Sequence, residues 1–364
     1  MVAMRPKQQP SWLDETQARA VLHTISFPGF EDEQTSKTAP LPAATLSTLS
    51  TLQMRFLLTF PFESLSLSYE PNGRMSSQLA HIYSRLITHR HGGGYCLQIN
   101  VLYREVLSFL GFRYVGVLGR VFSPMSGEWT GFSHSATLVY LPSHVDGKGA
   151  YYLSDVGFGS GPLRPMFLRD GWEERGRGSD RFRLVKGVQP KSTLEPDPNS
   201  SEEVDPEVKA VAVTQTAWIL QNHKGREWEK CYSFHPFECN LSDCHTANYG
   251  TSHPGSVPFA VMIIVVAYRL ASHFDAEKSS ELVKQDGLHE DLHPYHPSMV
   301  EQRMIVDDKF IVKVGDEQTV FKIIETEEER VRLLKDEFGL LGHVTTEEAL
   351  ATIKDKPSRL KSKE

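Results

Sequence analysis

Apolar and polar positions repeat with helical spacing through the first third of the chain. This pattern predicts helices over residues 12–25, 46–58 and about 76–90. The glycines at 92–94 then interrupt the pattern, because glycine is costly inside a helix. Apolar residues return at helical spacing afterwards, so a further helix is expected to begin at residue 95 or 96 and to end before Gly111.

Beyond Gly111 the apolar runs shorten and are typical of strands. Strands are predicted over 112–122, 133–141, 150–153, 182–185, 211–220 and 259–268, with a hairpin over 304–314 and 319–324. The polar stretches 189–207 and 273–297 are expected to be insertions, the first an exposed loop. A last helix is predicted over 327–338, with Thr326 as N-cap and Glu329 completing a capping box. Helices followed by strands indicate an α+β fold.

Length and composition limit the class of protein. The 364 residues suggest two or three packed units, and 40% hydrophobic residues are too many for a disordered chain. A net charge of −7 argues against a nucleic-acid partner. The first ten residues lack a secretory apolar run, and the longest apolar run, 259–267, is about half of a membrane span. Four cysteines are too few for a disulfide scaffold, so we expect a reducing, cytoplasmic setting without membrane contact.

Cys96 is the candidate nucleophile. It follows Tyr95 and three glycines and falls in the first turn of a predicted helix. A helix N-terminus carries partial positive charge and free N–H groups, which favour a thiolate. A thiolate is a good nucleophile toward acyl carbons. A buried structural cysteine after a helix-breaking turn is an equally open interpretation of the local sequence.

A nucleophilic cysteine needs a base and an acid that orients it. His134 begins an apolar predicted strand, and Asp155 ends another and precedes Val-Gly-Phe-Gly. Side chains on adjacent strands, about 5 Å apart, can share a hydrogen bond, so the aspartate can fix the imidazole tautomer and stabilise its charged form. Each residue also has a structural interpretation: His134 could be an exposed histidine in a turn, and Asp155 could be a turn-forming aspartate.

The other cysteines invite a zinc interpretation. Cys231, Cys239 and Cys244 lie near His235 and His245, but none of them forms a Cys-x-x-Cys pair. This spacing argues against a structural zinc site, so no metal is expected.

Several segments together resemble the arylamine N-acetyltransferases. The motif residues are Arg-His-Gly-Gly-Gly-Tyr-Cys-Leu-Gln-Ile-Asn at 90–100, Pro-Phe-Glu-Ser-Leu at 61–65, the strand around His134, and Tyr-Leu-Ser-Asp-Val-Gly-Phe-Gly at 152–159. Further matches follow in the family's order, at 218–221, 232–234 and 243–259. The resemblance spans roughly residues 20–340, and the insertions look like those of fungal members.

Three positions depart from the family pattern. Gly92 stands where the motif has an arginine, and Ser64 stands where it has an asparagine. Thr24 stands where an N-terminal arginine pairs with the glutamate that matches Glu63. Arg90 is the candidate to serve Glu63 instead.

The resemblance implies a three-part fold with a cysteine-protease-like Cys-His-Asp arrangement. A helical bundle at 1–111 would carry the cysteine, and a β-barrel at 112–215 would carry the histidine and aspartate. An α/β lid at 216–345 and a flexible tail at 346–364 would follow.

The resemblance also implies ping-pong acyl transfer, with no bound cofactor and acetyl-CoA as co-substrate. An acetyl group would pass through Cys96 to an aromatic amine or hydrazine, in a monomeric protein. Malonyl-CoA or another acyl-CoA is an alternative donor; a Cys-His-Asp hydrolase or transglutaminase-like enzyme and a non-catalytic binder are alternative functions. By motif position, the donor site would be lined by Thr130, Gly131, Ser133 and Tyr249. The acceptor pocket would be lined by Phe62 and Phe158, although each also fits a plain core role.

Overall fold

The first third of the chain is helical. The computed structural model describes residues 5–71, 73–142, 148–194, 205–223, 225, 227–254 and 258–361. The helices here are α1 (Glu15–Thr24), α2 (Glu33–Thr38), α3 (Leu46–Thr59), α4 (Ser66–Tyr69), α5 (Leu79–Tyr83) and α6 (Cys96–Phe109), with a short strand β1 (Phe62–Glu63) between α3 and α4. The predictions for α1, α3 and α6 are confirmed. The helix predicted at about 76–90 is shorter and ends in a π-helical turn, Ser84–Thr88.

Local capping and burial explain these helices. Asp14 and Thr45 accept hydrogen bonds from the first turns of α1 and α3, satisfying N–H groups that have no partner within the helix. Helix α6 is buried over most of its length, including Leu97, Ile99 and Leu102, and forms the centre of the largest apolar core. The first residue of this helix is Cys96.

An eight-stranded antiparallel sheet forms the middle of the molecule. Its strands are β2 (Arg113–Ser123), β3 (Glu128–Leu141), β4 (Ala150–Ser154), β5 (Met166–Phe167), β6 (Trp172–Arg175), β7 (Arg181–Val188), β8 (Thr216–His223) and β9 (Trp228–Phe234). They follow the order β5-β4-β3-β2-β9-β8-β7-β6, and the two edge strands adjoin, so the sheet is nearly closed. The predicted boundary at residue 215 is wrong, because β8 and β9 belong to this barrel.

A five-stranded sheet forms the third part, in the order β1-β10-β11-β12-β13. Its further strands are β10 (Ile264–Leu270), β11 (Val300–Val306), β12 (Lys309–Val314) and β13 (Glu317–Ile323). Because β1 comes from the N-terminal part, this sheet is tied to the helical unit. The predicted hairpin is confirmed where β12 pairs with β13, but its first strand is in its first part wrong, because Asp307, with φ of 55°, turns the chain between β11 and β12.

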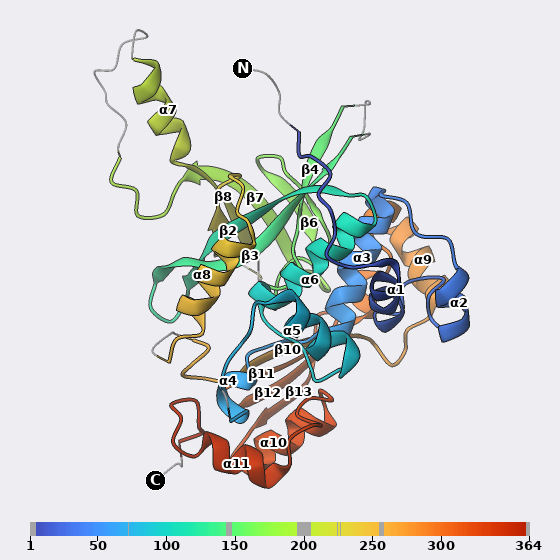
Figure 1. Ribbon diagram of the computed structural model, residues 1–364, viewed down its shortest axis with the longest axis vertical. Coiled ribbons are helices and arrows are strands. Elements are labelled where there is room, and N and C mark those ends of the chain that lie inside the picture. Colours follow the sequence, from blue (N-terminus) through green and yellow to red (C-terminus); the bar gives the residue numbers. More distant parts are fainter. Residues whose placement is uncertain are drawn as a thin grey trace.

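Two C-terminal helices cover the far side of this sheet, α10 (Glu327–Asp336) and α11 (Thr346–Ile353) (Figure 1). Thr326 caps α10 as predicted, but Glu329 accepts from Glu325 N rather than completing the capping box. The prediction of a flexible tail over 346–364 is wrong for the residues of α11. Ile353 and its neighbours in this helix pack into the core beneath the sheet. Residues 362–364 lie outside the described chain.

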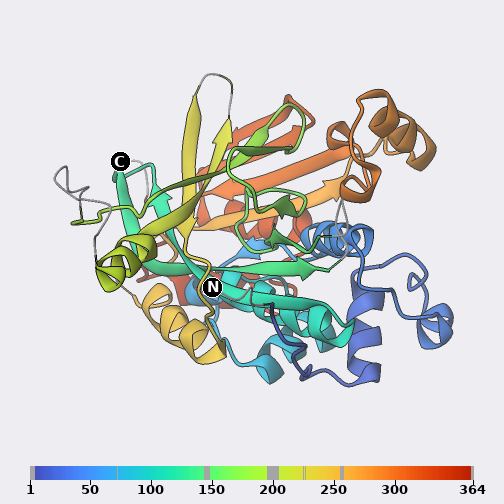
Figure 2. The same cartoon turned by 90° about the horizontal axis from the view of Figure 1, so that it is seen from above.

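Three further helices follow or separate the barrel strands: α7 (Pro206–Thr214), α8 (Leu241–Thr251) and α9 (Ala276–Gln285). The first half of the strand predicted at 211–220 is wrong, because these residues belong to α7. This helix projects from the body of the molecule (Figures 1 and 2). Part of the predicted loop 189–207 lies outside the described residues. Among those described, no helix is both long enough and apolar enough to cross a membrane.

Candidate active site

Close backbone packing sets the position of Cys96 at the start of α6. A Cβ atom on Gly93 would overlap the carbonyl oxygen of Pro61, and one on Gly157 would lie 2.5 Å from Cys96 Cα. Only glycine allows these approaches. The loop before the cysteine is also bonded to β1, with Glu63 N donating to Gly94 O at 3.1 Å. Cys96 is 3% exposed, and its Sγ lies 3.6 Å from Ser133 O.

The structure brings His134 and Asp155 together beside this helix start. His134 lies on β3 and Asp155 follows β4, and the two strands pair directly. His134 Nε2 lies 2.7 Å from Asp155 Oδ2, and both residues are buried. Burial alone would lower the pKa of His134, but the charges of Asp155 and Cys96 outweigh it and raise that pKa to about 10. With Nε2 engaged, Nδ1 is the nitrogen left to exchange a proton with the cysteine.

Asp155 is fixed by four hydrogen-bond donors. Asn100 Nδ2 and Gly157 N each lie 2.9 Å from Oδ1, while Tyr232 OH donates to Oδ2 at 3.0 Å beside the histidine. Burial tends to raise the pKa of Asp155, but His134, Asn100 and the Gly157 N–H hold it below its usual value. The carboxylate therefore stays ionised and keeps the imidazole in one orientation.

Asn100 and Tyr232 carry roles that the sequence analysis did not assign. Asn100 sits one turn after Cys96 on α6 and also donates to Ser135 O at 2.7 Å. The Tyr232 ring lies 4.4 Å from the His134 ring, centroid to centroid. Both fall within segments that match the family, but a motif match does not show which side chain faces the aspartate.

Glu63 supports the glycine loop from below. It is fully buried and accepts from Leu65 N at 2.5 Å and from Gly93 N at 3.1 Å. Its cation is Arg85, whose Nη2 lies 3.4 Å from Glu63 Oε1. The assignment of Arg90 to this role is wrong, because that side chain is exposed, with φ of 53°.

A second set of bonds links the start of α6 to α8. Tyr95 OH and Gln98 Nε2 both donate to Asn248 Oδ1, at 2.7 and 3.0 Å, and Asn248 Nδ2 donates to Met75 O at 2.7 Å. Phe259 stacks on the Tyr95 ring, with centroids 5.2 Å apart and planes 8° apart. Tyr95, the residue before the cysteine, is thus held both by the hydrogen bond from its hydroxyl and by the stacked ring.

One of the predicted donor-site residues contacts the sulfur. Ser133 O lies 3.6 Å from Sγ, and the Ser133 hydroxyl lies 2.7 Å from Thr130 Oγ1. Gly131 is exposed, with no atom near its missing Cβ. Tyr249 is 78% exposed on α8, one residue after Asn248. Their role in binding a donor remains a prediction.

Of the two predicted acceptor-pocket residues, Phe158 contacts the histidine and Phe62 contacts the glycine that follows Phe158. Phe158 meets the His134 ring edge-on, with centroids 5.2 Å apart. Phe62 on β1 lies against Gly159, whose missing Cβ would be 3.2 Å from the Phe62 ring. Both are partly buried, so they are compatible with a core role or with a substrate-facing one.

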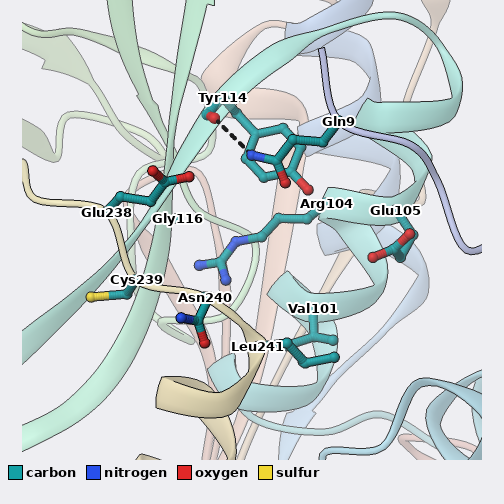
Figure 3. Close-up of a pocket in the computed structure, with 10 residues that line it drawn as sticks. All are labelled: Gln9, Val101, Arg104, Glu105, Tyr114, Gly116, Glu238, Cys239, Asn240 and Leu241. Carbon is teal, nitrogen blue, oxygen red and sulfur yellow. Dashed lines mark hydrogen bonds between the residues drawn. The ribbon is translucent and has the colours of Figure 1, made fainter. Parts of the chain in front are cut away.

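A pocket between β2, α6 and the start of α8 is drawn in Figure 3; no triad residue lines it. Arg104 extends from α6 toward it. The guanidinium donates to Ser135 Oγ and Ala136 O, at 2.7 and 2.6 Å, and to Thr137 Oγ1 at 3.1 Å. All three acceptors lie on β3, so this arginine fixes the helix of the cysteine to the strand of the histidine. Among the described residues, no cluster of three His, Cys, Asp or Glu side chains could hold a metal.

Comparison with known proteins gives the family. The model of a family described as "N-acetyltransferase" matches residues 45–273. This chain belongs to the arylamine N-acetyltransferase family. The arylamine N-acetyltransferase of Escherichia coli is 25% identical over 211 residues, which are 58% of this chain and 62% of that protein. N-malonyltransferase FDB2 of Gibberella moniliformis is 31% identical over 137 residues, or 35% of this chain, and the match spans only 38% of that relative.

Solved arylamine N-acetyltransferases share the fold. The enzyme of Mycobacterium abscessus has a TM-score of 0.64 at 20% identity, covering 96% of this chain and 99% of its own. The Mycobacterium marinum enzyme in complex with CoA has a TM-score of 0.64 at 19% identity, covering 93% and 98%. At these identities the likeness shows the fold alone, and it confirms the predicted α+β class with a barrel-like sheet.

Proposed function

We propose that this N-acetyltransferase family member is an acyl-CoA:arylamine N-acyltransferase that works through an acyl-Cys96 intermediate. The observation that carries the proposal is the placement of a cysteine at a helix start next to a buried histidine. An aspartate that accepts four hydrogen bonds keeps this histidine protonated. This arrangement keeps a nucleophilic sulfur and an acid within one water-poor site.

In the first half-reaction, the Cys96 thiolate attacks the carbonyl carbon of the acyl-CoA. The new S–C bond forms as the bond to the CoA sulfur breaks, and the His134 imidazolium gives its proton to the departing thiolate. One thioester replaces another, so the step is nearly isoenergetic. The imidazole is left neutral beside the acyl-cysteine, with Asp155 still on Nε2.

In the second half-reaction, the amine nitrogen attacks the acyl-cysteine carbon. Neutral His134 takes the proton from that nitrogen, the C–S bond breaks, and the Cys96 thiolate and imidazolium are restored. The amide is much more stable than the thioester, which drives transfer to the amine. Asp155 stays ionised and stabilises the imidazolium that forms.

The substrate-binding residues are part of the same proposal. In this proposal the acyl-CoA donor is bound by Thr130, Gly131, Ser133 and Tyr249. The contact between Ser133 O and the Cys96 sulfur supports this assignment. Phe158 would give an arene a flat apolar wall beside the imidazole, and Phe62 would extend it past Gly159. The predicted cytoplasmic location and monomeric state stay predictions.

The acyl donor has two candidates. Acetyl-CoA is the donor that the family name suggests. Malonyl-CoA is the second candidate, because three of the curated relatives are N-malonyltransferases of Gibberella and Fusarium. Both donors pass through the same acyl-cysteine, so the proposed chemistry does not depend on the choice.

Intact-protein mass spectrometry tests the proposal. The protein is incubated with acetyl-CoA or with malonyl-CoA and no amine, and then weighed. One added acyl group that is absent in Cys96→Ala and disappears when an aromatic amine is added supports the proposal. If neither donor nor any other short acyl-CoA leaves an adduct, the acyltransferase proposal fails. A non-catalytic binder would then remain, or a hydrolase of peptide or glutamine amides.

A further inference from the structure

Three side chains on one face of α6 contact β3 at regular intervals. They are four residues apart along the helix, so each lies about 6 Å beyond the one before it. Their contacts on the strand, Ser133, Ser135 and Thr137, are two residues apart, or about 6.8 Å. The two intervals nearly match, so the helix and the strand lie side by side in a single register. The three helix residues are Cys96, Asn100 and Arg104.

The contact from Arg104 is the most extensive of the three. Its guanidinium donates to three successive residues of β3, whereas the cysteine makes one long contact with this strand and the asparagine makes one short one. The three acceptors are Thr137 Oγ1 at 3.1 Å from Nε, and Ser135 Oγ at 2.7 Å and Ala136 O at 2.6 Å from Nη2. The arginine therefore contributes most to holding the helix and the strand in this register.

The shape of the guanidinium makes this contact specific for one register. Its donors form a rigid planar fork, so they match acceptors only at fixed positions. A slip of one residue along a strand turns every side chain to the opposite face. Ser135 Oγ and Thr137 Oγ1 would then point away from Arg104, and both hydrogen bonds would be lost. The same slip would move His134 by about 3.4 Å relative to Cys96.

Stability alone does not account for a guanidinium at this place. Arg104 is 7% exposed, and among the described residues none of its hydrogen-bond partners is a carboxylate; the fourth partner is the sulfur of Cys244, 3.5 Å from Nη1. A buried charge without a counter-ion is costly, and an apolar side chain would avoid that cost. Gly116 on β2 leaves the space for this group, since a Cβ atom there would lie 3.0 Å from the guanidinium carbon.

The register matters because the reacting groups lie at one end of this contact. Ser135 directly follows His134, and α6 holds its carbonyl oxygen through Asn100 and its hydroxyl through Arg104. The reaction derived above needs the Cys96 sulfur beside the His134 imidazole. A misplacement of about 1 Å in such a pair costs about 100-fold in rate.

We propose that Arg104 is a positioning residue of the acyl transfer: it locks α6 against β3 and so keeps the Cys96 sulfur beside the His134 ring. The inference rests on the proposed function, because it assigns the arginine a part in the same reaction. Arg104 acts through other residues, since it lies about two turns along α6 from the cysteine. Its loss should therefore slow the chemistry at the sulfur without weakening donor binding.

The test measures how fast iodoacetamide alkylates Cys96 in wild type, Arg104→Met and Arg104→Lys, with the labelled peptide identified by mass spectrometry. At pH 5.5 we expect both variants to react about 10- to 100-fold more slowly than wild type, because the sulfur and the imidazolium are no longer held together. Lysine keeps the charge but lacks the planar fork, so it should not restore the rate. At pH 9.5 the three rates should converge, because a thiol without a cation partner is largely ionised there.

Arg330→Lys is the matched control for the loss of a buried guanidinium. Arg330 is fully buried in the C-terminal part, and among the described residues none of its hydrogen bonds goes to α6 or β3. We expect this variant to lose stability in urea but to keep the wild-type alkylation rate at pH 5.5.

Single-turnover acylation gives a second readout, with acetyl-CoA or malonyl-CoA as donor. Arg104→Met should lower the maximal rate about 10-fold or more. The donor concentration that gives half of the maximal rate should stay within about twofold of wild type, because the arginine does not contact the donor in this proposal.

Smaller changes on β3 test the same contact without removing the arginine. Ser135→Ala removes one of its acceptors and Thr137→Val removes another, each with little change in volume. Each should slow alkylation at pH 5.5 by about threefold, the usual worth of one hydrogen bond. Ser135→Ala should have no further effect when it is added to Arg104→Met, because the hydrogen bond that it removes is already gone.

Two outcomes overturn the proposal: a folded Arg104→Met protein that is alkylated at the wild-type rate at pH 5.5, or an equal loss of rate in Arg330→Lys. If Arg104→Met does not fold, unchanged rates in both Ser135→Ala and Thr137→Val overturn it. Alkylation needs no acyl transfer, so slow alkylation of the Arg104 variants supports the positioning role even if no acyl-enzyme forms. Acylation of Arg104→Met at the wild-type rate supports the proposed function and overturns the positioning role.

Discussion

Replacing Arg85 by methionine tests how the chain holds the glycine loop before Cys96. Arg85 Nη2 lies 3.4 Å from Glu63 Oε1, and Nη1 lies 2.7 Å from Glu70 Oε1. Methionine keeps much of the aliphatic stem and removes the charge. The fully buried Glu63 carboxylate is then left without its cation, while Glu70 is partly exposed and keeps His343 at 3.2 Å.

The expected loss of stability follows from this geometry. Removing one partner of a buried ion pair costs about 3–5 kcal/mol, because the other charge remains in a poorly solvated place. Glu63 keeps hydrogen bonds from Leu65 N and Gly93 N, and its contact with Arg85 is long. We therefore expect the lower end, about 3 kcal/mol, or roughly a 100-fold fall in the folding equilibrium constant.

Urea unfolding followed by circular dichroism measures this loss. Arg85→Met should lower the midpoint with little change in the m-value. Adding Glu63→Gln should restore about 1 kcal/mol, because it removes the buried charge, although the amide oxygen keeps only one of the two backbone hydrogen bonds that the carboxylate accepts. Arg90→Met is the matched control, expected within about 0.5 kcal/mol of wild type because Arg90 is exposed. A loss under about 1 kcal/mol in Arg85→Met, or no recovery in the double variant, would refute the reasoning.

Three further predictions concern the triad itself. Gly157→Ala places a Cβ 2.5 Å from the Cα atom of Cys96 and should lower kcat/KM more than 10-fold; steady-state kinetics check this against Gly250→Ala, where nothing lies within 4 Å. Asn100→Ala removes a donor from the buried Asp155 and should cost about 2 kcal/mol or more of unfolding free energy in urea; a cost near zero would contradict it. The His134 pKa is raised to about 10, so its ion pair with Asp155 stabilises the fold fully below about pH 6.5 and loses this effect as the pH rises toward 10. The difference in urea unfolding midpoint between wild type and His134→Gln should therefore shrink across that range. A constant difference would count against the ion pair.

The sequence predicted the parts of the site that depend on local signals. Glycines followed by helical periodicity placed Cys96 at a helix start, and an apolar run placed His134 on a strand. Pairing of that strand with the one before Asp155 then follows from short connections between neighbouring strands. These residues meet because two adjacent elements carry them.

Long-range partners could not be predicted in the same way. Arg85 reaches Glu63 only because a π-helical turn aims it inward, and nothing in the local pattern distinguishes it from Arg90. The donation from Tyr232 to Asp155 depends on barrel closure across strands that are distant in sequence.

The errors in the fold have physical reasons as well. Apolar residues lie on both sides of Asp-Asp-Lys at 307–309, and reading across this short polar interruption made two strands look like one. The valines of α7 suggested a strand, although Asp205 caps a helix there. The lysine-rich C-terminal segment led to the prediction of a flexible tail, although α11 has an apolar face on which Ala349 and Ile353 are buried.

Alkylation of Cys96 tests the central claim most directly. Wild type, His134→Gln and Asp155→Asn are treated with iodoacetamide from pH 5 to pH 9, and the labelled peptide is identified by mass spectrometry. A sulfur paired with a protonated imidazole should react rapidly even at pH 5 to 6 in wild type, and both variants should lose that reaction. Equal alkylation of all three proteins at mildly acidic pH would contradict the account.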